Sequence, residues 1–149
     1  MGHRGGSWVI VQAALLALFL VVPQEEPWPY PDLFRFVGWA LAVSGILLLT
    51  WSALNLGRSL TPFPQPLPQG HLVTTGAYRF VRHPMYFAVL TVCFGFSLAS
   101  FSPLRLILAL ILFSFFDLKA LREEVLLKKK YPDYAAYKSR VKKLIPWIY

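Results

Sequence analysis

The chain has 149 residues, of which 56% are apolar and only 15% charged, so it offers less polar surface than a soluble domain of this size needs. Its 15 Lys and Arg outnumber its 7 Asp and Glu, but the basic residues flank apolar runs, which favours anionic lipid headgroups as partners and argues against nucleic acid. The single cysteine, Cys93, excludes a disulfide framework and a thiolate metal cluster, and no metal site is expected.

Four apolar segments follow one another along the chain. The first, residues 8–22, lies behind His3 and Arg4 and has no small-residue cleavage site after it, which predicts an uncleaved membrane anchor. The second, residues 33–56, is long enough to cross a bilayer with tilt. One of its faces carries small side chains, where a helix of the same chain or of another chain could approach closely: Gly38, Ala42 and Gly45.

The third and fourth apolar segments cover residues 85–99 and 103–121. Pro103 suits the first turn of a helix, and the helical pattern of the fourth segment continues past the lipid through DLKALREEVLLKKK. A short amphipathic helix that starts at Pro132 is expected in the tail, with one stripe formed by Tyr134, Tyr137, Val141 and Leu144. Between the second and third segments, the Pro-rich stretch TPFPQPLPQ excludes helix and is expected to run extended along the membrane surface.

Charge placement orients these segments. The first connection holds Glu25 and Glu26, whereas most basic residues fall at the N-terminus, in the loop of residues 57–84 and in the tail of residues 122–149. Cytoplasmic loops of membrane proteins carry an excess of Lys and Arg, so both termini and this loop are placed in the cytoplasm. The sequence therefore predicts an all-α integral membrane bundle, a single domain over residues 1–149 with four transmembrane helices and an amphipathic helical tail.

The cytoplasmic loop ends in the sequence GHLVTTGAYRFVRHPMYF. Gly76 allows a backbone turn that other residues resist. Arg82 and His83 stand at the mouth of the third span, where an ionisable side chain is costly unless it has a partner or a task. Pro84 then begins the span, so both side chains and the exposed amides of its first turn point toward one place, which is a favourable site for an anion. An Arg fork suits a carboxylate or a phosphate held by two bonds.

Glu123 and Glu124 form an acidic pair just beyond the fourth apolar segment. They could pair with Lys119 and Lys128, each four residues away on the same helix, or they could accept hydroxyl or ammonium donors from a ligand. The tail adds side chains that could either anchor it at the membrane interface or contribute to a site: Tyr131, Tyr134, Tyr137 and Arg140.

The string GAYRFVRHPMY, the later REE, the YPDYAAY and the terminal IP together resemble the isoprenylcysteine carboxyl methyltransferase family, which is related to the phospholipid N-methyltransferases. The resemblance covers residues 60–146, with the motifs in the same order. The family often has Gly two residues after the second motif Tyr, and Ala88 stands at that position in this chain.

The resemblance implies a methyltransferase that uses S-adenosylmethionine, releases S-adenosylhomocysteine and acts at the cytoplasmic face of a bacterial or archaeal membrane. The acceptor would be a lipid or another lipophilic molecule with a carboxylate, amine or thiol, and the oligomeric state is open. Arg82, His83 and Glu124 are the candidate catalytic residues. The cofactor-binding positions implied by the family motifs are Gly76, Tyr78, Arg82, His83, Pro84, Tyr86, Glu123, Glu124, Tyr134, Tyr137 and Arg140.

Two other functions compete with methyl transfer. Sterol reductases share a similar C-terminal half and bind NADPH there, but they carry added spans that would enclose a sterol. A non-catalytic membrane scaffold would need neither a ligand nor strict retention of Arg82 and Glu124. These alternatives differ in the ligand that should stabilise the folded protein, so a binding measurement separates them.

Overall fold

A computed structural model describes residues 5–23 and 31–149 of the chain. Glu25 and Glu26 of the first connection, and His3 and Arg4 at the N-terminus, lie outside the described residues. Within the described parts the protein is all-α, with no strand. The helices are α1 (Gly6–Val21), α2 (Asp32–Leu56), η2 (Gly57–Ser59), η3 (Gly76–Arg79), α3 (Pro84–Ala99), α4 (Pro103–Lys130) and α5 (Tyr134–Arg140).

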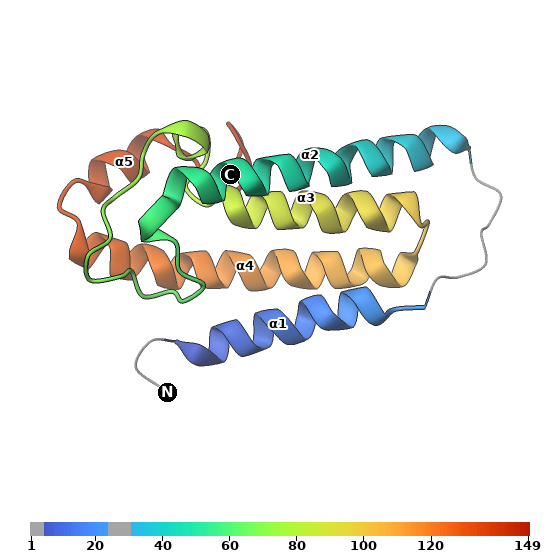
Figure 1. Cartoon of the computed structure of the whole chain (residues 1–149), viewed down its shortest axis with the longest axis horizontal. Coiled ribbons are helices and arrows are strands. Elements are labelled where there is room, and N and C mark those ends of the chain that lie inside the picture. Colours follow the sequence, from blue (N-terminus) through green and yellow to red (C-terminus); the bar gives the residue numbers. More distant parts are fainter. Residues whose placement is uncertain (1–4, 24–30) are drawn as a thin grey trace.

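The four long helices lie side by side along the long axis of the molecule (Figure 1). Both α3 and α4 begin with a proline, which suits a first turn because its missing N–H has no partner there in any case. Ser102 caps α4 by accepting a hydrogen bond from the Arg105 amide at 3.3 Å. Prolines in the sequence therefore set where the two C-terminal long helices begin.

The small-residue face of α2 packs against α3 within the same chain. Gly38, Ala42 and Gly45 are all buried. A methyl group added at Gly38 would lie 2.4 Å from the backbone nitrogen of Ala99, and one added at Gly95 would lie 2.6 Å from the nitrogen of Ala42. The two backbones thus approach too closely for any side chain, and small residues at a helix contact allow such an approach.

Helix α1 packs against α4 and completes the bundle. Trp8 contacts Phe115 with ring centroids 5.6 Å apart, and Phe19 is buried in the apolar core. At the other end of α1, the buried Arg105 guanidinium donates to the carbonyl oxygen of Val22 at 2.7 Å and lies 4.9 Å from the centroid of the Phe96 ring. The core between α1, α3 and α4 includes Phe19, Leu90, Cys93, Leu108, Leu112 and Phe116.

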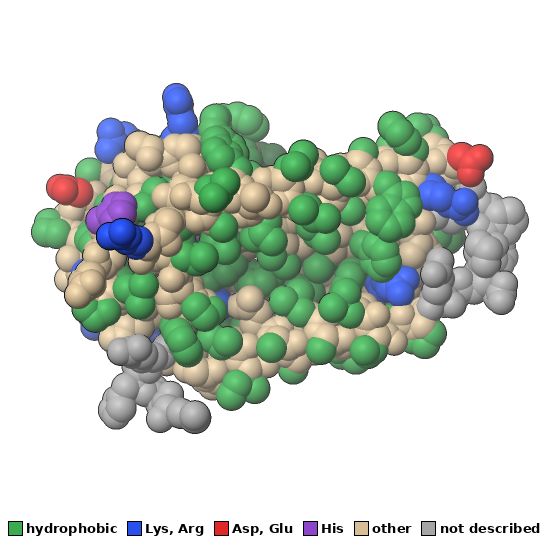
Figure 2. All heavy atoms as spheres, in the orientation of Figure 1, with side chains coloured by type: hydrophobic (Ala, Val, Ile, Leu, Met, Phe, Trp, Pro, Cys, Tyr) green, Lys and Arg blue, Asp and Glu red, His purple; other side chains and the backbone are tan. Residues whose placement is uncertain are grey.

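The outer surface of the bundle is strongly apolar. Figure 2 shows hydrophobic side chains along its length, with most charged side chains gathered at its two ends. Leu54, Leu47 and Phe36 on α2 are 75%, 66% and 72% exposed. By length and composition, one stretch of the described chain, Asp32–Ser59, is long and apolar enough to cross a membrane, whereas α1 and α3 are shorter apolar helices.

The polar elements gather at one end of the bundle. Helix α4 continues without a break to Lys130, and α5 starts at Tyr134 rather than at Pro132. Because α5 ends at Arg140, Val141 and Leu144 lie outside the helix on which the sequence had placed them. The segment between α2 and α3 loops over this end of the bundle beside α5 (Figure 1).

Candidate functional site

A cavity of about 370 Å³ opens where the looped segment meets the ends of the helices. Its walls come from α2, α3, α4 and α5, from residues 59–73 of the loop, and from Gln12 of α1. This volume lies within the range of small-molecule and cofactor sites. Tyr78, Arg82, His83, Tyr86, Glu123, Tyr134 and Tyr137 all line it, so seven of the positions named from the sequence meet at one cavity.

The turn that carries Arg82 and His83 is held by the C-terminal segment. The Arg82 amide donates to the Lys142 carbonyl at 2.8 Å, and the His83 amide donates to the Lys143 carbonyl at 3.1 Å. Val81 forms a parallel bridge with Lys142. These bonds fix the backbone just before Pro84, the first residue of α3, so the tail and the motif form one unit.

The buried Glu124 carboxylate lies in a cluster of basic side chains. It accepts from Arg82 Nε at 2.8 Å and from Lys138 Nζ at 2.6 Å, and it lies 3.4 Å from His83 Nε2. Burial opposes its charge, but the bonds from His83, Lys138 and Arg82 hold the pKa of Glu124 well below the ordinary carboxyl value. Glu124 is 3% exposed and does not line the cavity.

The Arg82 guanidinium joins this cluster to the tail. Besides Glu124 it donates to the carbonyl oxygens of Val141 and Lys138, the latter at 3.2 Å. Arg side chains can make such divergent bonds because their donors form a fixed planar fork. Arg82 therefore fastens α4 and the tail to the turn before α3, while part of its side chain borders the cavity.

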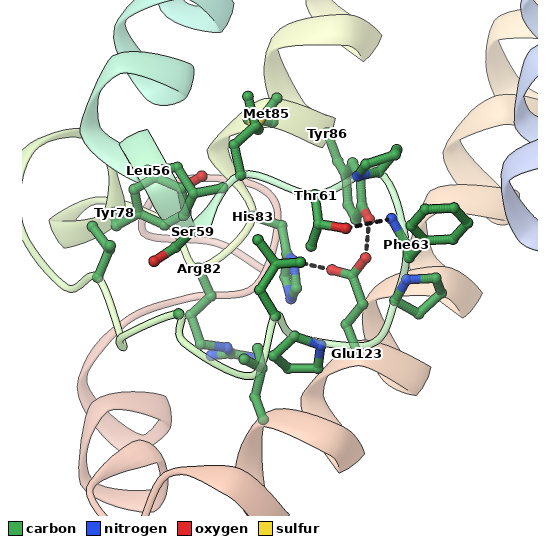
Figure 3. Close-up of a pocket in the computed structure, with 18 of the residues that line it drawn as sticks. Leu56, Ser59, Thr61, Phe63, Tyr78, Arg82, His83, Met85, Tyr86 and Glu123 are labelled. Carbon is green, nitrogen blue, oxygen red and sulfur yellow. Dashed lines mark hydrogen bonds and ion pairs between the residues drawn. The ribbon is translucent and has the colours of Figure 1, made fainter. Parts of the chain in front are cut away.

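Glu123, one position earlier on α4, faces the cavity. Its carboxylate accepts a hydrogen bond from the Tyr86 hydroxyl and lies 3.4 Å from His83 Nδ1. Figure 3 draws His83, Tyr86 and Glu123 among the side chains that line the pocket. The His83 and Tyr86 rings stack with centroids 5.4 Å apart and planes 2° from parallel.

His83 is held between the two carboxylates. Burial disfavours its charged form, but hydrogen bonds and charge from Glu123 and Glu124 outweigh burial and raise the pKa of His83 above the ordinary value. Neither Glu123 nor Glu124 makes an ion pair with Lys119 or Lys128 within the described chain, so the intrahelical pairing considered from the sequence is wrong.

Three tyrosines close the polar end of the cavity. The Tyr137 hydroxyl donates to the Tyr78 carbonyl at 2.5 Å, and the rings of Tyr134 and Tyr137 meet edge to face with centroids 6.0 Å apart. Burial raises the pKa of Tyr78, Tyr134 and Tyr137. The tyrosines therefore stay neutral, so they can offer ring faces and hydroxyl donors but no phenolate base.

Besides Glu124, three residues named from the sequence lie outside the cavity lining. Gly76 has φ +60°, and a methyl group there would lie 2.0 Å from Oδ1 of Asn55, so it shapes the turn. Pro84 begins α3. Arg140 donates to the carbonyl of Ala136 at 3.1 Å and borders a second hollow on the outer face of the tail.

The Pro-rich stretch forms no helix, as expected, and the loop that contains it forms a wall of the cavity. Side chains from α4 and the residue after it hold the loop through its carbonyl groups. Tyr131 donates to Gly70 at 2.7 Å, Lys119 donates to Pro62 at 3.0 Å, and Lys130 donates to Leu67. The spacing of these residues gave no sign of such contacts, which join positions about sixty residues apart.

Gln12 and Lys119 are lining residues that the sequence reasoning missed. Gln12 is a lone amide in an otherwise apolar run, and that was a usable signal because an amide in lipid needs a partner. Lys119 was considered only as a helix-surface partner of Glu123. Among the described residues, no group of three or more His, Cys, Asp or Glu side chains could hold a metal ion.

Comparison with known proteins identifies the family of this chain. Residues 33–134, from the second residue of α2 to the first residue of α5, match the family described as phospholipid methyltransferase. The chain is also 31% identical over 150 residues to a nickel-cobalt-cadmium resistance protein, NccN, of Alcaligenes xylosoxydans xylosoxydans. That alignment covers 97% of this chain but 65% of the relative, so the chain spans about two-thirds of the relative's length. The family match covers more than half of the chain and includes the RHP turn and both glutamates, and the chain therefore belongs to the phospholipid methyltransferase family.

Proposed function

We propose that this protein is a methyltransferase that uses S-adenosylmethionine to methylate a lipophilic acceptor at the cytoplasmic face of a membrane. The observation that carries the proposal is the cavity, whose lining combines the RHP turn, Glu123 and three tyrosines with apolar side chains of the helices and the loop. Family membership supports methyl transfer. A cavity of this kind suits a polar cofactor beside an apolar substrate.

The proposed topology has four membrane-spanning helices, α1 to α4, with both termini in the cytoplasm. Helices α1 and α3 have 16 residues each, about 24 Å of helix at 1.5 Å per residue, so they would need flanking residues to cross about 30 Å of hydrocarbon. The cavity end carries the basic run Lys128, Lys129 and Lys130. The positive-inside rule therefore favours a cytoplasmic cavity.

The residues at the polar end fit the chemistry of S-adenosylmethionine. The amides of Met85 and Tyr86 in the first turn of α3 have no acceptor within the helix and suit the cofactor's carboxylate. The Glu123 carboxylate suits ribose hydroxyls or the ammonium group. The rings of Tyr78 and Tyr137 suit the adenine or the sulfonium, because a cation is attracted to a ring face.

The chain's own contribution to catalysis would be alignment and exclusion of water. When bound, S-adenosylmethionine supplies an electrophilic methyl group, and transfer needs an acceptor in line with the bond that breaks. The loop of residues 59–73 forms one wall of the cavity, and with ligands bound it would limit the access of water to the reacting groups. We propose that His83 and Glu123 contact the ligands, whereas Arg82 and Glu124 position the turn through their ion pair.

A binding experiment in detergent tests the proposal. S-adenosylhomocysteine should raise the unfolding midpoint of the purified protein in a concentration-dependent way, because it binds the folded state only. Glu123→Gln should abolish this response. Asp133→Asn, the same carboxylate-to-amide change at an exposed position, should retain it. Stabilisation by NADPH alone would instead favour the reductase alternative, and silence from both ligands would favour a scaffold.

A further inference from the structure

A second hollow, of about 350 Å³, lies between α4 and the tail. Arg82 lines both this hollow and the cavity described above, whereas Glu124 lines the hollow only. Five cationic side chains line the hollow against a single carboxylate, that of Glu124. The cations are Arg82, Lys138, Arg140, Lys142 and Lys143. The hollow is therefore strongly basic, and the proposed methyl transfer gives it no role.

Two of these cations have no counter-ion among the described residues. The carboxylates of Glu124 and Asp117 pair with the other three. Arg140 and Lys142 form no ion pair within the described chain, and both side chains are exposed. Arg140 uses its Nε to donate to the Ala136 carbonyl at 3.1 Å, so the other nitrogens of its guanidinium remain for a ligand. The hollow thus carries an uncompensated positive charge that attracts anions.

An exposed apolar strip borders this basic surface. On α4 it is formed by Leu118, Leu121 and Val125, which share one face of the helix because they are three and four residues apart. The tail adds Trp147 and Ile148, which are 82% and 75% exposed. Leu121 and Ile148 also line the hollow, so the strip and the cations meet there. Basic side chains beside an apolar surface are the composition expected where a protein contacts anionic lipid.

Residues 144–149 form a closed turn that presents Trp147 at the surface. The amides of Leu144 and Ile145 donate to the Tyr149 carbonyl oxygen at 2.8 Å and 2.7 Å. Trp147 has φ +61°, a left-handed conformation that is rare for a bulky residue and persists only where the surrounding structure imposes it. The exposed Trp147 ring is therefore held in a defined place.

The ion pair between Asp117 and Lys143 fastens this turn to α4, and Lys143 also donates to the Tyr149 hydroxyl at 2.7 Å. In the proposed topology α4 starts at the far side of the membrane with Pro103, and Leu121 lies about 27 Å along the helix at 1.5 Å per residue. A hydrocarbon core is about 30 Å thick, so Leu121 lies near its cytoplasmic edge. The hollow therefore opens where phospholipid headgroups meet their acyl chains.

We propose that this hollow binds an anionic phospholipid at a site separate from the cavity. The lipid phosphate lies between Arg140 and Lys142, and an acyl chain runs along the apolar strip of α4. A guanidinium suits a phosphate because its planar fork can donate two parallel bonds. A headgroup without an ammonium leaves the phosphate charge uncompensated, so the two free cations favour an anionic lipid over a zwitterionic one. The inference rests on the membrane placement proposed above and not on methyl transfer.

The test measures lipid binding to the detergent-purified protein by native mass spectrometry. Phosphatidylglycerol, phosphatidylcholine with the same acyl chains, and glycerol 3-phosphate are titrated separately. For the wild-type protein we expect phosphatidylglycerol to bind about thirtyfold more tightly than phosphatidylcholine, which corresponds to about fivefold for each of two basic side chains near an anionic headgroup. Glycerol 3-phosphate should not bind in the same concentration range, because it lacks the acyl chains that would contact α4.

Two double variants locate the site. Arg140→Gln combined with Lys142→Gln should bring the ratio of the two lipid affinities close to one. Lys128→Gln combined with Lys129→Gln is the matched control, because it removes the same charge from exposed residues in the last turn of α4 that line neither cavity, and it should keep the ratio. If the first double variant does not fold, Lys142→Gln alone should lower the ratio about fivefold.

Equal binding of the two lipids by the wild-type protein would overturn the inference. An unchanged ratio in the variant of Arg140 and Lys142 would also overturn it, as would an equal loss in the control, since the whole basic end would then attract the lipid. Binding of glycerol 3-phosphate as tight as that of phosphatidylglycerol would overturn the lipid as the occupant. The titration contains no S-adenosylhomocysteine, so its result is independent of the methyl-transfer proposal.

Discussion

Replacing Glu124 with Gln removes the α4 carboxylate that bonds both to Arg82 of the RHP turn and to Lys138 of the tail. The substitution keeps the shape of the side chain but leaves the Arg82 guanidinium, 2.8 Å away, without its counter-ion. Breaking a buried ion pair from one side costs about 3–5 kcal/mol. The Lys138 side chain is 48% exposed, so solvent screens its ion pair with Glu124, and losing that pair adds little to the cost.

We therefore expect Glu124→Gln to lower the free energy of unfolding by about 3 kcal/mol, the low end of that range, because the amide oxygen still accepts a hydrogen bond from Arg82. At about 2–4 °C per kcal/mol, the unfolding midpoint should fall by about 6–12 °C. The assay is thermal unfolding in detergent followed by the fluorescence of the five tryptophans.

Glu123→Gln is the matched control, because it makes the same chemical change one residue away. The Glu123 carboxylate is less buried than that of Glu124 and bonds to Tyr86 and His83, so we expect Glu123→Gln to lower the free energy of unfolding by about 1 kcal/mol. The two glutamates should thus separate, with Glu124→Gln the less stable variant and Glu123→Gln the one that fails to respond to S-adenosylhomocysteine. The reasoning would be refuted by a Glu124→Gln midpoint within about 2 °C of wild type, or by the opposite order of stabilities.

Four further predictions concern the pH dependence of stability, helix packing and the loop. The pKa of Glu124 is depressed in the folded state, so the charged Glu124 stabilises the fold above the ordinary carboxyl pKa, and this stabilisation is lost as pH falls below it. The unfolding midpoint of the wild-type protein should therefore drop more steeply between pH 5 and pH 3 than that of Glu124→Gln. The pKa of His83 is raised in the folded state, so protonated His83 stabilises the fold below the ordinary histidine pKa, and this stabilisation is lost as pH rises above about 6.5. The same measurement of midpoint against pH on His83→Gln should not show this loss. Gly38→Ala should destabilise the protein by about 1–3 kcal/mol, because the added methyl group would meet the backbone of α3. Ser44→Ala, on the exposed side of the same helix, should have little effect. Equal unfolding midpoints for the two variants would contradict this packing. Tyr131→Phe removes the hydrogen bond to the Gly70 carbonyl, so amide hydrogen exchange should become faster in residues 57–75 and stay unchanged in α3. Unaltered exchange in residues 57–75 would show that this hydrogen bond does not hold the loop in place.

The long helices were predictable from the sequence because their signals are local. Apolar runs, a proline at the first position of α3 and of α4, and the small-residue face of α2 all act within a few residues. The contact of Gly38 and Gly45 with α3 settles that this face serves packing within the chain. The RHP turn and the acidic pair were also recognisable, since the motif residues are contiguous.

The sequence could not assign separate places to Glu123 and Glu124. Neighbouring residues on an α-helix point about 100° apart, so the rotation of α4 against α3 decides which carboxylate faces the cavity and which faces the cationic cluster. For the same reason the helical spacing of Lys119 and Glu123 suggested a pair that does not form. Lys119 bonds instead to α1 and to the loop, about one hundred and about sixty residues away.

The sequence by itself determined the all-α class, the helices and the motif, because apolar periodicity, prolines and contiguous polar residues are written along the chain. The tertiary structure decided where the loop of residues 59–73 folds, which glutamate lines the cavity and what surrounds Lys119. Those features depend on bonds between distant segments, such as that from Tyr131 to Gly70, and such bonds exist only after the helices have packed.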